Sequence, residues 1–596
     1  RSNISGSPPT YSDFATTLKE AQVYSGGSYE DYLIKPDKVD SLLLNGLNCL
    51  AIQIHNSSIT STDLSSNFNL SVGIANNSIN YRPTASWFTP PFFSTNLPLL
   101  IVKTLNGAAV VDEPKVMASM GIVNNNVGLN TELDSANEYD GLIGIEIRGA
   151  SSQIFPKKGY SVETRLADSS NNNVSLLGLP KENDWILHGP YADKSLLRNT
   201  LAYHLGGKTN LYTPRTRLCE LILNDKYQGL YVLTEKIKRD KNRVDIKNLK
   251  PEDIDEVEIT GGYIFQIDRD DPNSSTDGWW TSSSPGKFVS YYDPKHEELN
   301  TLQKDYLRTF FTSFETTMNG PAFRTHYTNF IDVESWVDYF LVTEMAKHID
   351  AYKLSFFMHK KHIDNGGKLN FGPLWDFNLG FGNFDFACSP EPDGWTYEFQ
   401  GTCDMSHPFW VKKLMVVPEI KDQINCRWNE LRKGPYSTDS LLQFIDTNVK
   451  NLTEVSERNF EKWPVLGKYV WPNYYVGDNY TDEIKYLKDW LVDRLEWMDD
   501  NMIGECRSVS TNKFEKVEPF NLNTFPNPAS DVVYTEHNQA YLNLQVTDVL
   551  GKLVKEVRVE NGINKVDVSS LQTGIYFFTY IDPNGLSATK RVLIER

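Results

Sequence analysis

Hydrophobic and polar residues follow two different periods along this chain of 596 residues. Short runs that alternate apolar and polar positions, or are wholly apolar, predict strands: "IGIEIRG", "GYSVETR", "LCELILN", "GLYVLTEKI" and "GGYIFQID". Apolar residues at helical spacing predict helices in "DYLRTFFTSFETTM", in "TDEIKYLKDWLVDRLEWMDDNM" and in "VESWVDYFLVTEMAKHI", which has Asp332 as its expected N-cap. Strands and helices mix without a regular βαβ repeat, so the pattern predicts an α+β fold.

The pattern divides the chain into four parts, as expected for a length that exceeds one hydrophobic core. Residues 1–97 are rich in Asn and Ser with strand-like runs, which predicts a β-rich region, the end of a β-sandwich whose beginning would precede residue 1. This region resembles the end of a galactose-binding-like jelly roll. Residues 98–506 form the α+β part and residues 507–519 a polar linker. Residues 520–596 hold short alternating strands between Gly and Asn turns, which predicts a small β-sandwich.

Charge and hydropathy exclude two classes of protein. The net charge is -18, which argues against a nucleic-acid partner because phosphate binding requires clustered Lys and Arg. No run approaches the roughly 20 apolar residues of a transmembrane helix, so no membrane span is expected. The chain starts at Arg1 without a signal-peptide core, so we expect any leader to have been removed or to lie outside this sequence.

The six cysteines lack the CxxC spacing of a zinc site. Cys388 and Cys403 bracket a loop rich in Pro and Gly, which predicts a disulfide between them. A link between Cys426 and Cys506 is a second option, because both flank predicted helices. The remaining two lie in apolar runs and are predicted to be buried thiols: Cys49 and Cys219.

The strongest candidate chemistry lies on a predicted hairpin. "AYKLSFFMHKK" and "KLNFGPLWDF" are joined by a turn with Asn365-Gly366-Gly367. Asp350 precedes the first strand and Asp376 ends the second, so both should lie at the same end of the hairpin, where opposed Cβ atoms are about 5 Å apart. Two close carboxylates call for a cation, and oxygen ligands, with Asn378 as a third, suit Mg²⁺, Mn²⁺ or Ca²⁺. The alternative is that each aspartate caps a turn.

A second candidate is the turn "EIRGASSQIFPKKGYSVE", which could hold phosphate through backbone and side-chain donors or could be an exposed basic turn. Its candidate nucleotide-binding residues are Arg148, Ser151, Ser152 and Lys158. Glu235, in "LYVLTEKIKR", is a candidate partner for a phosphate-holding lysine, with a surface charge pair as the alternative. The acidic run "IDRDDPN" could bind Ca²⁺ but fits an acidic turn better; its carboxylates are Asp268, Asp270 and Asp271.

Five stretches of the chain occur in the order found in the CotH kinase family, the spore-coat protein kinases and their secreted bacterial relatives. The chain resembles this family from Ile145 to Asn383. They are "IEIRGASSQIFPKKGYSVETR", "DKSLLRNTLAYHLG", "LNDKYQGLYVLTEKI", "HIDAYKLSFFMHKK" and "LNFGPLWDFNLGFGN". The resemblance implies an atypical protein-kinase-like fold that uses ATP and a divalent metal, Mg²⁺ or Mn²⁺, to phosphorylate protein Ser or Thr. It implies that Asp376 binds the metal and that Asp350 is the catalytic aspartate. Gln266 departs from the family, whose members often carry Glu at that position.

The last part has its own resemblance. "FPNPASD", "VTDVLGKLV", "LQTGIYFF" and "KRVLIER" are similar to the type A sorting domain of type IX secretion in Bacteroidetes. This likeness implies that residues 520–596 engage the type IX secretion machinery and that the protein is exported across the outer membrane to the surface or the medium.

Two further interpretations stay open at this stage. The kinase-like domain could be a catalytically inactive scaffold in a surface-binding or structural protein, because ATP is scarce outside cells and a fold does not establish an activity. A carbohydrate-binding or carbohydrate-hydrolysing protein is the other, suggested by many acidic residues and by Trp279, Trp280 and Trp395.

Overall fold

The computed structural model describes residues 93–125, 127–269, 277–399, 407–506, 522–583 and 587–596. The predicted β-rich region therefore lies almost wholly outside the described residues, and the predicted linker 507–519 lies entirely outside them.

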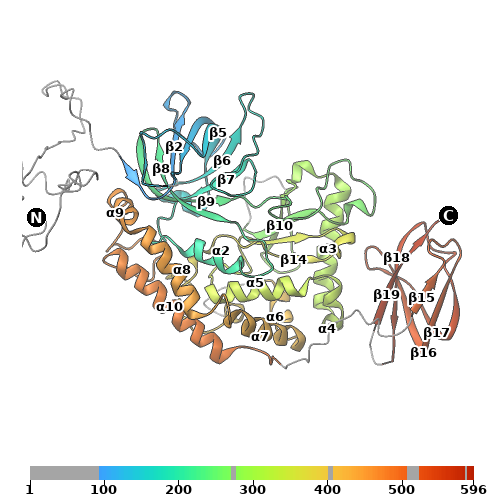
Figure 1. The fold of residues 1–596 in the computed structure, drawn as a ribbon. Helices are drawn as coiled ribbons and strands as arrows, with labels where there is room; N and C mark the ends of the chain where they lie inside the picture. The colour runs from blue at the N-terminus through green and yellow to red at the C-terminus, as the bar shows by residue number, and fades with distance from the viewer. Residues whose placement is uncertain (1–92, 126, 270–276, 400–406, 507–521, 584–586) are drawn as a thin grey trace, which may run out of the picture. The chain divides into compact units, whose positions relative to one another are not determined.

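Seven strands close into a barrel at the start of the central region (Figure 1). Strand β2 (Leu99–Thr104) pairs antiparallel with β3 (Val116–Val123) and parallel with β8 (Thr216–Leu223), and this parallel pair completes the ring. The other strands of the barrel are β5 (Tyr139–Arg148), β6 (Gly159–Arg165), β7 (Asp184–His188) and β9 (Lys226–Glu235), and a short pair is formed by β1 (Ser94–Thr95) and β4 (Asn130–Thr131). The predicted strands are thus confirmed, but nothing in the sequence pattern predicted that they close.

The second part of the central region is an antiparallel sheet covered by helices, in the strand order β11-β12-β10-β13-β14. Its strands are β10 (Tyr263–Asp268), β11 (Trp279–Thr281), β12 (Phe288–Asp293), β13 (Phe356–Lys360) and β14 (Leu369–Phe371). Its helices are α2 (Arg198–Gly206), α3 (Thr301–Asn319), α4 (Phe323–His326), α5 (Val333–Ala346), α6 (Phe409–Leu414), α7 (Pro418–Arg432), α8 (Thr438–Asn451), α9 (Thr453–Lys462) and α10 (Tyr480–Asn501).

Helix α5 forms the centre of this helical part. Asp332 caps it as predicted, accepting a hydrogen bond from the Ser335 N–H at 2.8 Å. Nearly every residue of α5 is buried, so the helix is surrounded by other elements. It ends at Lys347, whose left-handed backbone (φ 43°) turns the chain toward Asp350 and β13.

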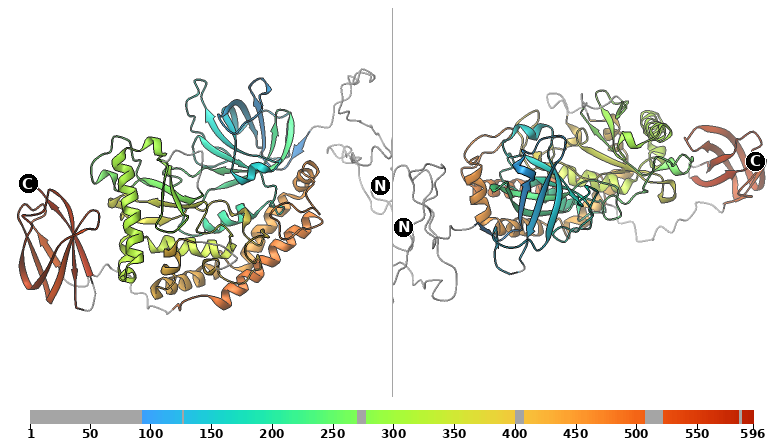
Figure 2. Two further views of the ribbon diagram at one scale, coloured as in Figure 1. Left: turned by 180° about the vertical axis from the view of Figure 1, so that it is seen from behind. Right: turned by 90° about the horizontal axis from the view of Figure 1, so that it is seen from above.

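Helices and barrel meet along strand β9, against which α9 packs, while α8 and α10 pack against each other (Figures 1 and 2). Arg458 on α9 forms an ion pair of 2.8 Å with Glu220 on β8. The indole N–H of Trp463 donates to the Gln228 carbonyl at 2.8 Å. Because Glu220 is fully buried, this ion pair fixes the position of the barrel relative to the helices.

The C-terminal region contains β15 (Leu522–Phe525), β16 (Val532–Asp548), β17 (Leu553–Asp567), β18 (Gly574–Ile581) and β19 (Ser587–Ile594). Its all-β content and its start near residue 520 are as expected from the sequence. Hydrogen bonds join the five strands into one sheet, however, where a sandwich of two sheets was predicted. The long strand β16 explains the difference, because its first half pairs with β15, its second half pairs with β18, and β17 pairs along both halves.

Two of the predictions about cysteines are confirmed. Cys426 on α7 and Cys506 beyond α10 form a disulfide, the second option above, and Cys219 is a free buried thiol as predicted. Cys388 is disulfide-bonded, but Cys403, its predicted partner, lies outside the described residues, as does Cys49. The link between Cys388 and Cys403 therefore stays a prediction.

We expect Cys426→Ser to lower the free energy of unfolding by up to about 4 kcal/mol, because the bond spans 80 residues and restricts the unfolded chain. Urea denaturation monitored by circular dichroism measures this. The double variant with Cys506→Ser should be no less stable than either single variant, since all three lack the same bond. Additive losses in the double variant would contradict the pairing.

Candidate functional site

The hairpin of β13 and β14 brings the two predicted carboxylates to one end, as expected. Met358 pairs with Phe371 and Lys360 with Leu369. Beyond these paired residues the chain continues toward Asp350 on one side and Asp376 on the other. The negative charge of Asp350 acts on the pKa of Asp376, so the two carboxylates share one electrostatic environment.

Asp376 has a backbone conformation that L-residues seldom adopt, with φ 58° and ψ 55°. It begins the short 3₁₀ turn η7 (Phe377–Leu379), yet in the described part of the chain its carboxylate caps no N–H of that turn. Its Oδ2 instead accepts a long hydrogen bond from the Ser355 hydroxyl at 3.5 Å. The alternative of a turn-capping Asp376 is therefore wrong, and the strained backbone is of the kind that marks functional sites.

Apolar side chains and one cation surround Asp376. Its N–H donates to the Tyr203 hydroxyl at 3.3 Å, and the Tyr203 ring stacks with Trp375 at 6.3 Å between centroids. The guanidinium of Arg148, at the end of barrel strand β5, lies 5.2 Å from the Trp375 ring centroid. Two residues predicted from separate motifs, Arg148 and Asp376, are thus brought together where barrel and helical part meet.

Asp268 adds a third carboxylate that sequence reasoning did not assign to this site. It ends strand β10, and its Oδ2 accepts a hydrogen bond from the Ser355 N–H at 3.3 Å. Ser355 therefore links the two carboxylates, because its amide donates to Asp268 and its hydroxyl donates to Asp376. The remaining two carboxylates of that acidic run, Asp270 and Asp271, lie outside the described residues.

Burial and charge act in opposite directions on Asp376. Burial raises its pKa most, the guanidinium of Arg148 lowers it, and the carboxylates of Asp268 and Asp350 raise it, with a result of about 6. Burial is also the main cause of the raised pKa of Asp268. Arg148 is the cation that acts on Asp376, while Arg269 lowers the pKa of Asp268 and Lys353 approaches Asp350 at 3.5 Å. A divalent cation beside Asp376 would offset the repulsion among the three carboxylates.

We expect the metal-free protein to lose stability through Asp376 as the pH rises. The ordinary pKa of 3.8 is raised to about 6 in the folded chain, so folding favours the protonated form. This contribution is complete below 3.8 and is lost as the pH passes 6, a difference of up to about 3 kcal/mol. Urea unfolding in EDTA between pH 4 and 7 should show the loss for the parent and not for Asp376→Asn. Parallel stability curves would contradict it.

The predicted phosphate-binding turn is ordered and lies at the end of β5 that carries Arg148. Gly149 has φ 105°, and a Cβ there would come within 2.0 Å of the Ser152 Oγ, so the turn requires glycine at this position. Ser151 and Ser152 are exposed. The Lys158 ammonium, however, donates to the Gln153 carbonyl at 2.6 Å, so it closes its own turn in this structure.

Glu235 needs a correction. It is fully buried, and its carboxylate accepts hydrogen bonds from the Arg215 guanidinium at 2.9 and 2.7 Å and from the Tyr212 hydroxyl at 3.1 Å. Its partner is therefore an arginine, not the predicted phosphate-holding lysine. The neighbouring Lys236 directly follows β9 and approaches Asp184 at 3.5 Å.

Asn378 enters a buried amide relay through its backbone. Its carbonyl accepts a hydrogen bond from the Asn383 side chain at 2.9 Å, and Asn383 accepts one from Asn473, also at 2.9 Å. Asn473 in turn donates to the Ala192 carbonyl at 2.6 Å. This relay fixes the turn that follows Asp376, while a metal-binding role of the Asn378 side chain stays a prediction.

The "DKSLLRN" motif, which sequence reasoning matched without explaining, has a related role. Asp193 and Arg198 form a buried ion pair of 2.7 Å. Arg198 also donates to the carbonyl of Phe381 at 3.4 Å. The backbone after Asp376 is thus held at two points: the amide relay contacts the Asn378 carbonyl, and Arg198 of α2 contacts the Phe381 carbonyl.

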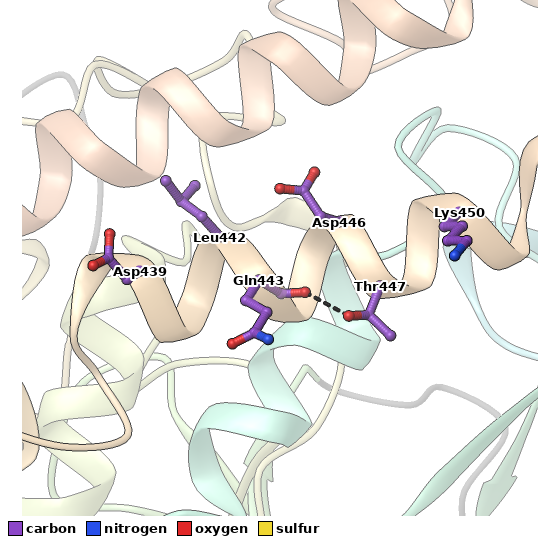
Figure 3. Close-up of a pocket in the computed structure, with 6 residues that line it drawn as sticks. All are labelled: Asp439, Leu442, Gln443, Asp446, Thr447 and Lys450. Atoms are coloured by element: carbon purple, nitrogen blue, oxygen red, sulfur yellow. Dashed lines mark hydrogen bonds between the residues drawn. The ribbon is translucent and has the colours of Figure 1, made fainter.

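Other candidate sites are weaker. Within the described ranges no group of three or more His, Cys, Asp or Glu residues has the geometry to hold a metal ion by itself. A shallow hollow lies along one face of α8, and none of the candidate site residues lines it (Figure 3); its lining residues are Asp439, Leu442, Gln443, Asp446, Thr447 and Lys450. Trp280 and Trp395 are buried and Trp279 packs edge-on against Phe288, so the tryptophans that suggested carbohydrate binding form no open surface.

Comparison with known families now identifies both parts. The model of the CotH kinase protein family matches residues 145–498, and that of a secretion system C-terminal sorting domain matches residues 523–595. No curated protein shows significant similarity to the chain. The sorting domain, of the type IX kind, suggests export to the cell surface or medium. Across the described ranges, every helix is too short or too polar to cross a membrane. Since the first match covers more than half of the 596 residues and includes Arg148, Asp350 and Asp376, the chain belongs to the CotH kinase family.

Proposed function

We propose that this protein is an exported protein Ser/Thr kinase that transfers the γ-phosphoryl group of ATP with the help of Mg²⁺ or Mn²⁺. The observation that carries the proposal is the environment of Asp376: a strained, mostly buried carboxylate beside two others, with one arginine nearby. Family membership supports the same reaction class.

The donor chemistry of the site fits a hard divalent cation. Its groups are carboxylate, hydroxyl and amide oxygens, which suit Mg²⁺ or Mn²⁺ and also Ca²⁺. Asp376 would be the principal ligand, with Asn378 as a further one, and Asp268 lies near enough to contribute charge. Held by these residues, a divalent cation would supply positive charge to offset the phosphate charge during transfer.

The positive side of the site comes from the barrel. Arg148, placed beside Trp375, would offset phosphate charge, and Ser151 and Ser152 offer exposed hydroxyls and backbone N–H groups in the adjoining turn. Lys158 donates to the Gln153 carbonyl, and its ammonium has further donors that could contact a phosphate. Catalysis in such a site consists mainly of positioning and electrostatic stabilisation.

Asp350 would orient the acceptor hydroxyl. It is exposed to 22% and lies 3.5 Å from the Lys353 ammonium, so its carboxylate is accessible to an acceptor. Its carboxylate would accept the hydrogen bond of the Ser or Thr hydroxyl and hold the oxygen in line for attack.

Isothermal titration of the full chain with ATP tests the proposal. We expect binding that requires Mg²⁺ or Mn²⁺, followed by phosphate transfer from labelled ATP to dephosphorylated casein. Binding without transfer to casein or to the protein itself would reject the activity and favour an inactive scaffold. ATP affinity that does not respond to metal would reject the assignment of the site.

We propose further that the sorting domain directs this kinase domain through the type IX machinery to the cell surface or the medium. Fractionation of cells that express the full chain, compared with a variant truncated before residue 523, would show whether export depends on the domain.

A further inference from the structure

Exposed aromatic side chains are concentrated in one short segment. Within the described ranges, five aromatic residues are exposed, and two of them, Phe525 and Tyr534, stack on each other in the sorting domain. The other three lie within six residues of one another: Tyr469, Trp471 and Tyr474, exposed to 57%, 43% and 48%. Together with Asp385 and Glu391 they are called the aromatic surface below.

Each ring of the aromatic surface is anchored to the chain segment that follows Asp376. The Tyr469 hydroxyl donates to Asp385 at 2.7 Å, and the Tyr474 hydroxyl donates to Glu391 at 2.8 Å. Trp471 stacks on Phe386 with centroids 5.8 Å apart and planes at 20°. Because Phe386 covers one face of Trp471 while 43% of the side chain stays exposed, the opposite face is open to solvent.

The support beneath these rings is rigid. The buried side chain of Asn473, between Trp471 and Tyr474, is the donor of the amide relay to Ala192 and Asn383. Next to it, Tyr475 stacks on Tyr486 at 4.4 Å with nearly parallel planes. Rings fixed in this way lose little conformational entropy when a ligand binds, so the aromatic surface is preorganised.

We propose that the aromatic surface binds a neutral polysaccharide. Flat rings offer the apolar faces of sugar rings a partner, and aromatic residues with a polar end are suited to such wet interfaces. The carboxylates of Asp385 and Glu391 each accept one tyrosine hydroxyl and keep further lone pairs for the hydroxyls of a sugar. The sorting domain suggests export, and polysaccharides are abundant outside cells.

The charges of the aromatic surface disfavour an anionic ligand. Asp385 and Glu391 would repel nucleic acid or an acidic polysaccharide. The carboxylates of Asp482, Glu483 and Asp478 each act on Tyr475 more strongly than Lys485 does, so the local field is negative, and a cationic peptide is the competing ligand that binding to poly-L-lysine would reveal. This site does not depend on kinase activity.

Affinity electrophoresis of the full chain in gels that contain laminarin, xylan, galactomannan or soluble starch tests the proposal. We expect at least one of these neutral polysaccharides to retard the parent. Trp471→Ala should weaken the retardation constant at least about tenfold, which corresponds to loss of one dominant contact. Tyr474→Ala provides a second, independent loss at the other end of the surface.

Tyr534→Ala is the matched control, because Tyr534 is also an exposed, stacked tyrosine (38% exposed) but lies in the sorting domain. It should bind like the parent, and thermal unfolding of all variants should confirm that they fold. Three results would overturn the proposal: no retardation in any of the four gels, unchanged binding by both variants, or equal loss in the control. Retention on poly-L-lysine alone would assign the surface to a cationic peptide.

Discussion

Replacing Asp376 with alanine should abolish metal-dependent ATP binding while the protein remains folded. The carboxylate is the proposed principal ligand of the cation, so its removal should weaken metal-supported nucleotide affinity by at least about a hundredfold, which corresponds to loss of one strong charged contact. The metal-free variant should be at least as stable as the parent at pH 7, because a carboxylate close to Asp268 and Asp350 is removed. Titration calorimetry with ATP and Mn²⁺ measures the first effect, and urea unfolding the second.

Two variants sharpen this test. Asp376→Asn keeps the shape and removes the charge, so it should lose metal affinity to a similar extent. Asp364→Ala removes a carboxylate that is exposed to 67% at the opposite end of the same hairpin and should bind ATP like the parent. If Asp376→Ala bound ATP and metal as tightly as the parent, the site would lie elsewhere.

Replacing Arg494 with methionine should cause the largest loss of stability, about 3 to 5 kcal/mol. Arg494 and Glu344 are both fully buried, and their charged atoms lie 3.8 Å apart. The guanidinium also donates to the carbonyls of Glu344, Pro392 and Gly394. Glu344 in turn accepts a hydrogen bond from the Tyr352 hydroxyl at 2.9 Å, so the loss should extend to the turn that carries Asp350.

Lys485→Met is the control on the same helix, α10. Lys485 forms an ion pair with Asp489 in which both side chains are exposed, to 72% and 56%, and such solvent-screened pairs contribute little to stability. Urea unfolding compares the two. The double variant Glu344→Leu with Arg494→Met should be more stable than the sum of its single changes predicts, because no charge is left buried. Equal effects of the buried and exposed changes would refute the argument.

Local sequence patterns predicted the elements of the central region that have strong short-range signals, but not β2, β3, β7 or the helices α6 to α9. The Asp332 cap fixes the start of α5, and the Asn-Gly-Gly turn fixes the hairpin that carries Asp350 and Asp376 to one end. The pairing of β2 with β8 joins residues far apart in the chain, and no local period encodes it. Closure of the barrel therefore could not be predicted from local sequence patterns.

The candidate site likewise combines features that local patterns predicted with features that they did not. The cation–π contact of Arg148 with Trp375 agrees with two motifs predicted separately, but Asp268 was missed because it joins the site only through the pairing of β10 with β13. Alternation predicted that Glu235 and Lys236 point in opposite directions; they contact different partners, Arg215 and Asp184, and β9 ends at Glu235. Alternation did not reveal that Glu235 pairs with Arg215, which lies on the segment that leads into β8.

Because β2 pairs with β8, the barrel can close only after β8 has been synthesised. Strand β2 is formed by some of the first residues of the central region, and its parallel neighbour is completed only at Leu223. Until that residue has left the ribosome, β2 exposes one unpaired edge, and such edges are templates for association with other chains. The nascent protein is therefore most prone to aggregation during synthesis of the first barrel strands, and each nonsense mutation before β8 would leave that edge permanently open.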